Sequence, residues 1–181
     1  MTISLCQRLE QRRAEKPIGL AYIIDERSRS NKDSIDHVFR VANGLRSLGI
    51  GKGDRIAVLS RNSVECAEAM TAILAAGASM VPIPSTATAD AQRNMLEDSA
   101  VKGIFVSDQY LDAALNHFMG VESIKPELRF ALETACDLFA DHRAWAYEFS
   151  TDSPDIEQAL DEEYDILYSS GTTGVPKGII H

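Results

Sequence analysis

The chain has 181 residues, of which 45% are hydrophobic and 25% are charged, an ordinary composition for a globular domain. Lys and Arg number 18 against 27 Asp and Glu, a net charge of −9, which argues against nucleic acid or an anionic membrane as the main partner. No apolar run reaches the length of a membrane span, and a chain of this length buries roughly 70% of its unfolded surface, enough for one core.

The first 60 residues alternate between helical and strand patterns. Asp33 or Ser34 is placed to cap a helix over 35–48, and Gly49 is placed to end it. The strand that we predict over 55–60 has a continuous apolar centre, which is typical of a strand covered on both faces. In order, we predict a helix over 2–14, a strand over 20–25, a polar turn over 26–32, a helix over 35–48 and a strand over 55–60.

The same alternation continues to about residue 132. Asn62 is predicted to cap the next helix, with Gly77 just beyond its end, and Thr88 or Asp90 to cap the one that follows. In order, we predict a helix from Asn62 to Ala76, a strand over 80–83, a helix through Asp98, a strand over 102–107, a helix over 109–119 and a strand over 129–132.

Strands that alternate with helices indicate parallel βαβ units. We therefore predict an α/β fold with a doubly wound, mainly parallel sheet and flanking helices, as one domain over residues 1–181.

Residues 137–165 follow no clear period and are rich in Asp and Glu. One interpretation is an acidic metal site, and the other is a solvated linker, which we favour because charge runs usually face solvent. Trp145, Tyr147 and Phe149 are expected to serve packing.

Cys6, Cys66 and Cys136 are odd in number and widely spaced, so they fit neither a zinc site nor a disulfide framework. We expect core thiols in a reducing cytosol. Residues 1–17 lack the apolar core of a signal peptide, and we therefore expect a cytoplasmic protein.

The most informative segment lies near the carboxyl end and follows a short apolar stretch, Asp165 to Tyr168, that is predicted to be a buried strand. Glycines allow the backbone to turn and approach a ligand, and Ser and Thr hydroxyls can donate to phosphate or bind Mg²⁺. A lysine adds a mobile charge suited to a polyphosphate. The segment reads Tyr168-Ser169-Ser170-Gly171-Thr172-Thr173-Gly174-Val175-Pro176-Lys177-Gly178.

This segment is not a Walker A loop, because Lys177 stands three residues after Gly174 and is followed by Gly178. A P-loop NTPase is therefore a poor match. The composition alone would also fit an ordinary Ser-, Thr- and Gly-rich surface turn.

As a complete string, the segment resembles the signature phosphate loop of the adenylate-forming enzymes, which include acyl-CoA synthetases, adenylation domains of peptide synthetases and luciferases. The resemblance extends upstream, to about Ser34. The supporting stretches are residues 42–58 (ANGLRSLGIGKGDRIAV), residues 75–84 (AAGASMVPIP) and residues 96–100 (LEDSA).

The resemblance implies an enzyme that joins a carboxylate to AMP, releases pyrophosphate and then transfers the acyl group to coenzyme A. It implies ATP and Mg²⁺ as cofactors and a small-molecule carboxylate as substrate. Ser169 would be a magnesium ligand. The residues that would hold the phosphates of ATP are Ser170, Gly171, Thr172, Thr173, Gly174 and Lys177.

The sequence stops at His181, three residues after the loop. The adenine, ribose and catalytic segments of such enzymes follow the loop, so we expect a fragment of the large N-terminal domain that is inactive by itself. The alternatives are a non-catalytic nucleotide-binding or interaction module and a stand-alone phosphohydrolase. We also expect an unpaired sheet edge at residues 165–168 that promotes self-association.

Overall fold

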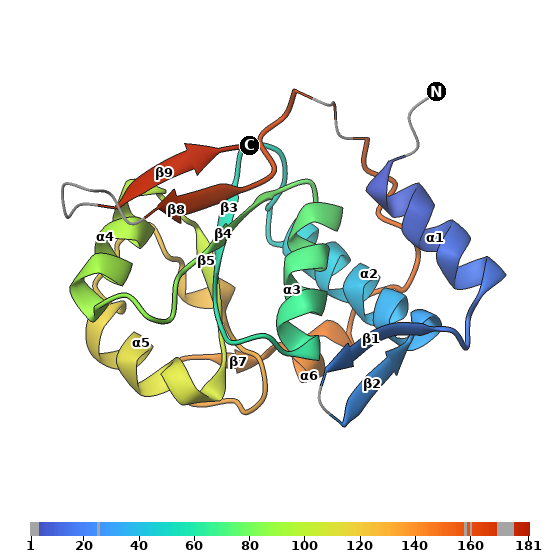
Figure 1. Ribbon diagram of the computed structural model, residues 1–181, viewed down its shortest axis with the longest axis horizontal. Coiled ribbons are helices and arrows are strands. Elements are labelled where there is room, and N and C mark those ends of the chain that lie inside the picture. The colour runs from blue at the N-terminus through green and yellow to red at the C-terminus, as the bar shows by residue number, and fades with distance from the viewer. Residues whose placement is uncertain (1–3, 25, 158, 160, 170–175) are drawn as a thin grey trace.

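The computed structural model describes residues 4–24, 26–157, 159, 161–169 and 176–181. Within these residues, a five-stranded parallel sheet runs through the centre in the order β4-β3-β5-β6-β7 (Figure 1). Its strands are β3 (Arg55–Leu59), β4 (Ser79–Pro82), β5 (Gly103–Val106), β6 (Arg129–Ala131) and β7 (Ala140–Asp141).

Helices cover both faces of this sheet, as Figure 1 shows. One apolar core contains Phe39, Ile73 and Phe130, and the other contains Leu96 and Ile104. The prediction of a doubly wound α/β fold is therefore confirmed. The first face carries α1 (Leu5–Glu15), α2 (Asn31–Ser47), α3 (Val64–Ala75) and α6 (His142–Ala146), and the second carries α4 (Ala89–Asp98) and α5 (Leu111–His117), with short 3₁₀ turns at Asp108–Tyr110 and Pro126–Leu128.

Two antiparallel hairpins lie beside the sheet. The first pairs β1 (Leu20–Ile24) with β2 (Arg27–Ser30), so the prediction of a polar turn over 26–32 was wrong. Backbone hydrogen bonds to β1 hold these polar residues in a strand, although their side chains give no apolar alternation.

The second hairpin pairs β8 (Ile166–Ser169) with β9 (Lys177–Ile180). A parallel bridge between Met80 and Asp165 attaches it to β4. The predicted strand over 165–168 is therefore present. The expectation that it forms an unpaired sheet edge was wrong, because Asp165 bridges to β4 and the following residues pair with β9. The burial of β8 is only partial, because Ile166 is buried while Leu167 is 41% exposed.

The helix caps differ in detail from the predicted ones. Thr88 caps α4 as expected, but Ser30 caps α2 and Ser63 caps α3. In both cases the Ser hydroxyl accepts a hydrogen bond from the backbone N–H three residues later, which satisfies an otherwise unpaired donor. Gly77 takes a φ of +83° just after α3, as expected for a residue that ends a helix.

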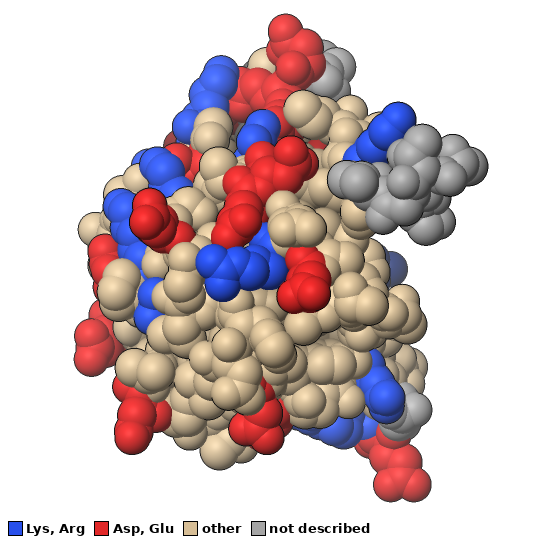
Figure 2. All heavy atoms as spheres, turned by 90° about the vertical axis from the view of Figure 1, so that its left-hand side faces the viewer, with Lys and Arg blue, Asp and Glu red and all other residues tan. Residues whose placement is uncertain are grey.

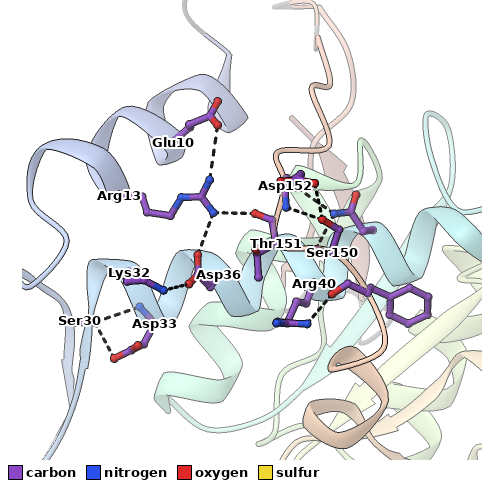
Figure 3. A network of polar contacts seen from close by, with 12 residues as sticks. Glu10, Arg13, Ser30, Lys32, Asp33, Asp36, Arg40, Ser150, Thr151 and Asp152 are labelled. Atoms are coloured by element: carbon purple, nitrogen blue, oxygen red, sulfur yellow. Dashed lines mark hydrogen bonds and ion pairs between the residues drawn. The ribbon is translucent and has the colours of Figure 1, made fainter.

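Within residues 137–165, β7 and α6 come first and an extended stretch then crosses α2 (Figure 3). Asn43 of α2 donates to the carbonyls of Ser150 and Asp152, at 2.9 and 3.0 Å. Trp145 packs between Phe130 and Phe149, with ring centroids 4.5 and 5.0 Å away.

The expected packing role holds for Trp145 and Phe149 but was wrong for Tyr147. The Tyr147 side chain is 72% exposed. Its ring instead lies under the guanidinium of Arg40, 5.4 Å from the ring centroid.

The three cysteines are free: Cys6 is buried, and Cys66 and Cys136 are half-buried. In the part of the chain that the structure describes, no helix combines the length and apolar character that crossing a membrane requires.

Candidate functional site

The β8–β9 hairpin places the two described residues of the predicted phosphate loop opposite each other. Ser169 ends β8, Lys177 begins β9, and the two are cross-strand partners. Both are exposed. The remaining predicted site residues, Ser170, Gly171, Thr172, Thr173 and Gly174, lie outside the described residues. The structure therefore defines the two ends of the loop.

Tyr168 fastens this hairpin to α4. Its hydroxyl donates to the carboxylate of Asp98 at 2.6 Å and lies 3.2 Å from the carbonyl oxygen of Met95. Partial burial and the hydrogen bond to Asp98 raise the pKa of Tyr168. The phenol therefore stays protonated and donates at neutral pH.

Gly178 lies against the ring of Tyr168, its cross-strand partner. A Cβ at position 178 would stand 3.0 Å from Ile166 and 3.3 Å from the Tyr168 ring. The absence of a side chain therefore lets the tyrosine cover the strand, an arrangement in which an aromatic ring packs over a cross-strand glycine.

The base of the hairpin is closed by Asp165 and His181. The Nδ1 atom of His181 lies 2.7 Å from a carboxylate oxygen of Asp165, whose side chain is only 7% exposed. The backbone N–H of Met80 in β4 donates to the carbonyl of Tyr164 at 2.9 Å. Side-chain and backbone contacts thus fix the hairpin to the edge of the parallel sheet.

The acidic residues just before β8 are paired with cations. Glu163 accepts two hydrogen bonds from Arg55, at 2.8 and 2.7 Å, and this interaction lowers the pKa of Glu163. Glu162 pairs with Lys52 at 2.6 Å. The carbonyl of Glu163 also accepts from the Ser79 hydroxyl.

These pairs favour an anchoring role over the alternative of an acidic metal site. Within the described ranges, no group of three or more His, Cys, Asp or Glu is arranged to hold a metal ion. The acidic run instead ties the chain to the start of β3 and β4 immediately before the loop.

Sequence reasoning missed β9 and the anchoring role of Tyr168. A Gly-rich turn between two short apolar runs is a hairpin signal, and residues 165–168 and 177–180 carry it. The hydroxyl contacts of Tyr168 join residues 70 and 73 positions apart, and no local pattern predicts them.

Figure 2 shows acidic and basic side chains interspersed on the face that includes α4, α5 and one end of the hairpin. Neither positive nor negative side chains dominate this face. A polyanion would therefore be attracted by individual cationic side chains and not by the face as a whole.

A parallel sheet with helices on both faces and a Gly-, Ser- and Thr-rich sequence between two strands at its edge is typical of α/β nucleotide-binding proteins. Comparison with known families narrows this class. Residues 9–181 match the family described as AMP-binding enzyme. The chain belongs to this family.

Individual relatives agree with that assignment. Malpibaldin synthetase of Mortierella alpina is 31% identical over 94% of this chain, and acetyl-coenzyme A synthetase of Streptomyces avermitilis is 31% identical over 87%. The match spans 3% and 26% of those two proteins. The N-terminal domain of FACL13 from Mycobacterium tuberculosis, a solved structure, is 27% identical and has a TM-score of 0.81 over 99% of this chain and 44% of its own.

Proposed function

We propose that this chain supplies the phosphate-binding part of an AMP-forming acid–CoA ligase. Such an enzyme converts a carboxylate and ATP to an acyl-adenylate and pyrophosphate, and then forms a thioester with coenzyme A. The observation that carries the proposal is the family match across residues 9–181, which includes the whole loop string.

In this proposal, Ser170 to Gly174 and Lys177 hold the β- and γ-phosphates of ATP. Lys177 suits this role because it is exposed at the start of β9, next to the loop, where a mobile ammonium can follow a polyphosphate. Neutralising phosphate charge while the carboxylate attacks is the main electrostatic contribution that such a loop can make.

Ser169 is proposed as a magnesium ligand. Its exposed position opposite Lys177 and its hydroxyl oxygen suit a cation that prefers oxygen ligands and substrate phosphates. The ion would supply additional charge neutralisation on the polyphosphate.

The curated relatives are several times longer than the region they share with this chain. We therefore propose that residues outside these 181 complete the acyl and coenzyme A sites, and that the 181-residue chain alone is inactive. We also infer a cytoplasmic location, supported by the three free thiols.

The ATP contact is tested by titrating the chain with Mg-ATP in ligand-observed NMR. We expect weak binding, because a phosphate loop lacks a base pocket, and about tenfold weaker binding in Lys177→Ala, the loss of one charge-assisted contact. Lys125→Ala removes an exposed lysine elsewhere and should bind like the parent. Equal binding by Lys177→Ala would contradict the assignment of Lys177.

The inactivity of the isolated chain is tested by pyrophosphate release with ATP and a panel of carboxylates. We expect no turnover above a no-protein blank. Carboxylate-dependent release would overturn the claim that further residues are required. ATP consumption without any carboxylate would instead support the phosphohydrolase alternative.

A further inference from the structure

A polar pocket lies between β2, α2 and α6. Its volume is about 300 Å³, within the range of small-molecule sites. The α2 residues that line it stand at positions i, i+3, i+4 and i+7, so they share one face of the helix. The lining residues are Arg29, Asp33, Asp36, His37, Arg40, Arg143 and Tyr147.

Three guanidinium groups from three different elements meet at this pocket. Arg40 donates to the carbonyls of Tyr147 and Phe149, at 2.9 and 2.6 Å. No carboxylate among the described residues forms an ion pair with Arg40. Within the described residues, its charge is therefore met by backbone carbonyls and by the ring of Tyr147.

Arg29 forms two long ion pairs with buried carboxylates. Its nearest carboxylates, Glu65 and Glu68, are both 3.6 Å away, beyond hydrogen-bond distance. The Nε atom of Arg29 is buried and has no hydrogen-bond partner within the described structure. Arg143 differs, because it donates to Glu68 at 2.5 Å.

His37 stands in the same positive environment. Its side chain lines the pocket, the residue is only 8% exposed, and its buried Nε2 has no hydrogen-bond partner among the described residues. Burial, followed by the charges of Arg143 and its neighbours His142, Arg29 and Arg40, lowers the pKa of His37 to about 3.

The acidic lining residues are already engaged. Asp36 pairs with Arg13 at 2.9 Å and with Lys32, and both contacts appear in Figure 3. Asp33 accepts a hydrogen bond from the Ser30 hydroxyl at 2.8 Å. Because Asp33 and Asp36 already have these partners, they compete less with an incoming anion for the guanidinium groups of the pocket.

We propose that this pocket binds an oxyanion of the phosphate class carried on a small molecule. Arg29 and Arg40 would donate to the oxyanion, because guanidinium groups match its geometry. A negative charge there would also stabilise the protonated form of His37. The site would be separate from the hairpin loop and independent of the function proposed for it.

The test is calorimetric titration of the Lys177→Ala chain, in which the loop is weakened, with inorganic phosphate and with phenyl phosphate. Binding of either ligand supports an oxyanion site, and a preference for phenyl phosphate shows that the anion is borne on a larger molecule. We expect Arg29→Gln and Arg40→Gln each to weaken binding about tenfold.

Arg8→Gln is the matched control, because Arg8 is exposed on α1 and should leave the affinity unchanged. Arg40→Lys keeps the charge and should bind more tightly than Arg40→Gln. The proposal is overturned if neither ligand binds saturably, or if Arg29→Gln and Arg40→Gln bind as well as Arg8→Gln.

A second readout is measured on the chain with Arg29, His37 and Arg40 unchanged, and a pocket variant serves only to assign the signal. Proton NMR of the His37 ring, assigned by its loss in His37→Gln, should show the pKa moving upward when the ligand is added to saturation. A His37 titration that is unchanged by the ligand would also overturn the proposal.

Discussion

At the scale of single residues, Tyr168, the first residue of the loop string, shows how one side chain can hold the β8–β9 hairpin in place. Its hydroxyl contacts the α4 residues Asp98 and Met95, and its ring packs against Gly178. Together with Ile166, which is buried in the same apolar core as Met95, the tyrosine thus links the hairpin to α4.

Tyr168→Phe keeps the ring and removes the hydroxyl. We expect a loss of about 1–2 kcal/mol in the free energy of unfolding, because the Asp98 carboxylate loses a partly buried donor. Urea denaturation measures the change. Tyr110→Phe is the control, since the Tyr110 hydroxyl has no hydrogen-bond partner among the described residues. A loss of equal size there would contradict the special role of Tyr168.

After Gly178, Gly44 is a second glycine at which the neighbouring side chains leave no room for a Cβ. It lies in α2, where a Cβ would stand 2.7 Å from one carbon of Trp145 and 2.8 Å from Phe149. The sequence contains no sign of this contact, because Trp145 comes from α6, about a hundred residues later in the chain.

Gly44→Ala should therefore destabilise the chain by about 1–3 kcal/mol, the usual cost of overpacking, even though alanine favours helices. Gly51→Ala is the control, because no atom lies within 4 Å of a Cβ at position 51. Thermal unfolding of both variants checks the prediction. A melting temperature for Gly44→Ala at or above that of Gly51→Ala would contradict it.

At the scale of elements, the pairing of Arg55 with Glu163 joins β3 to the segment that leads into β8. Because the pair lowers the pKa of Glu163 in the folded chain, it stabilises the fold above the pKa of an unfolded Glu, about 4.3. This stabilisation is lost as the pH falls through the lowered pKa of the folded state.

Glu163→Gln should accordingly be less stable than the parent by about 1 kcal/mol at pH 7, with the difference shrinking below about pH 4. Denaturant unfolding at several pH values measures it. Glu127→Gln, at an exposed site, should show no such pH-dependent difference. If the stability difference between Glu163→Gln and the parent stays constant with pH, the ion pair is not its cause.

At the scale of the whole molecule, the described part of the sheet system ends at β9, whose only strand partner there is β8. Ile179 and Ile180 on this strand are 49% and 59% exposed. An exposed strand edge with apolar side chains is a template for pairing with another chain. We therefore predict that the 181-residue chain self-associates through β9.

Light scattering over a range of concentrations tests this prediction. Ile179→Lys should shift the chain toward monomer, because a charge on an edge strand opposes pairing. Ile18→Lys is the control, since Ile18 is 91% exposed outside β9. A strict monomer at all concentrations, or an equal shift with Ile18→Lys, would contradict pairing through β9.

The sequence predicted the parallel α/β layer well, because the apolar runs at 55–60 and 102–107 and the capped helices between strands are local signals. The sequence did not predict the strand Arg27–Ser30. Its alternating Arg and Ser side chains carry no apolar pattern, and the strand forms because its backbone pairs with β1. The attachment of residues 147–152 to α2 could not be predicted, since Arg40 and Asn43 bind backbone carbonyls and any sequence supplies carbonyls.

For the candidate site, the string from Tyr168 to Gly178 predicted the family, and the match over residues 9–181 confirms it. The structure adds that Ser169 and Lys177 are cross-strand partners. The roles assigned to individual loop residues stay predictions, because residues 170–175 lie outside the described part of the chain.

The pairing of Ser169 with Lys177 has a consequence for how the loop can vary. Successive side chains of a strand point to opposite faces, so shifting the pairing of β9 by one residue would turn Lys177 to the other face of the hairpin. An inserted or deleted residue between the two strands can therefore turn Lys177 away from the phosphate position that we propose for it. In the proposed site, the number of residues between the two strands matters as much as their identity.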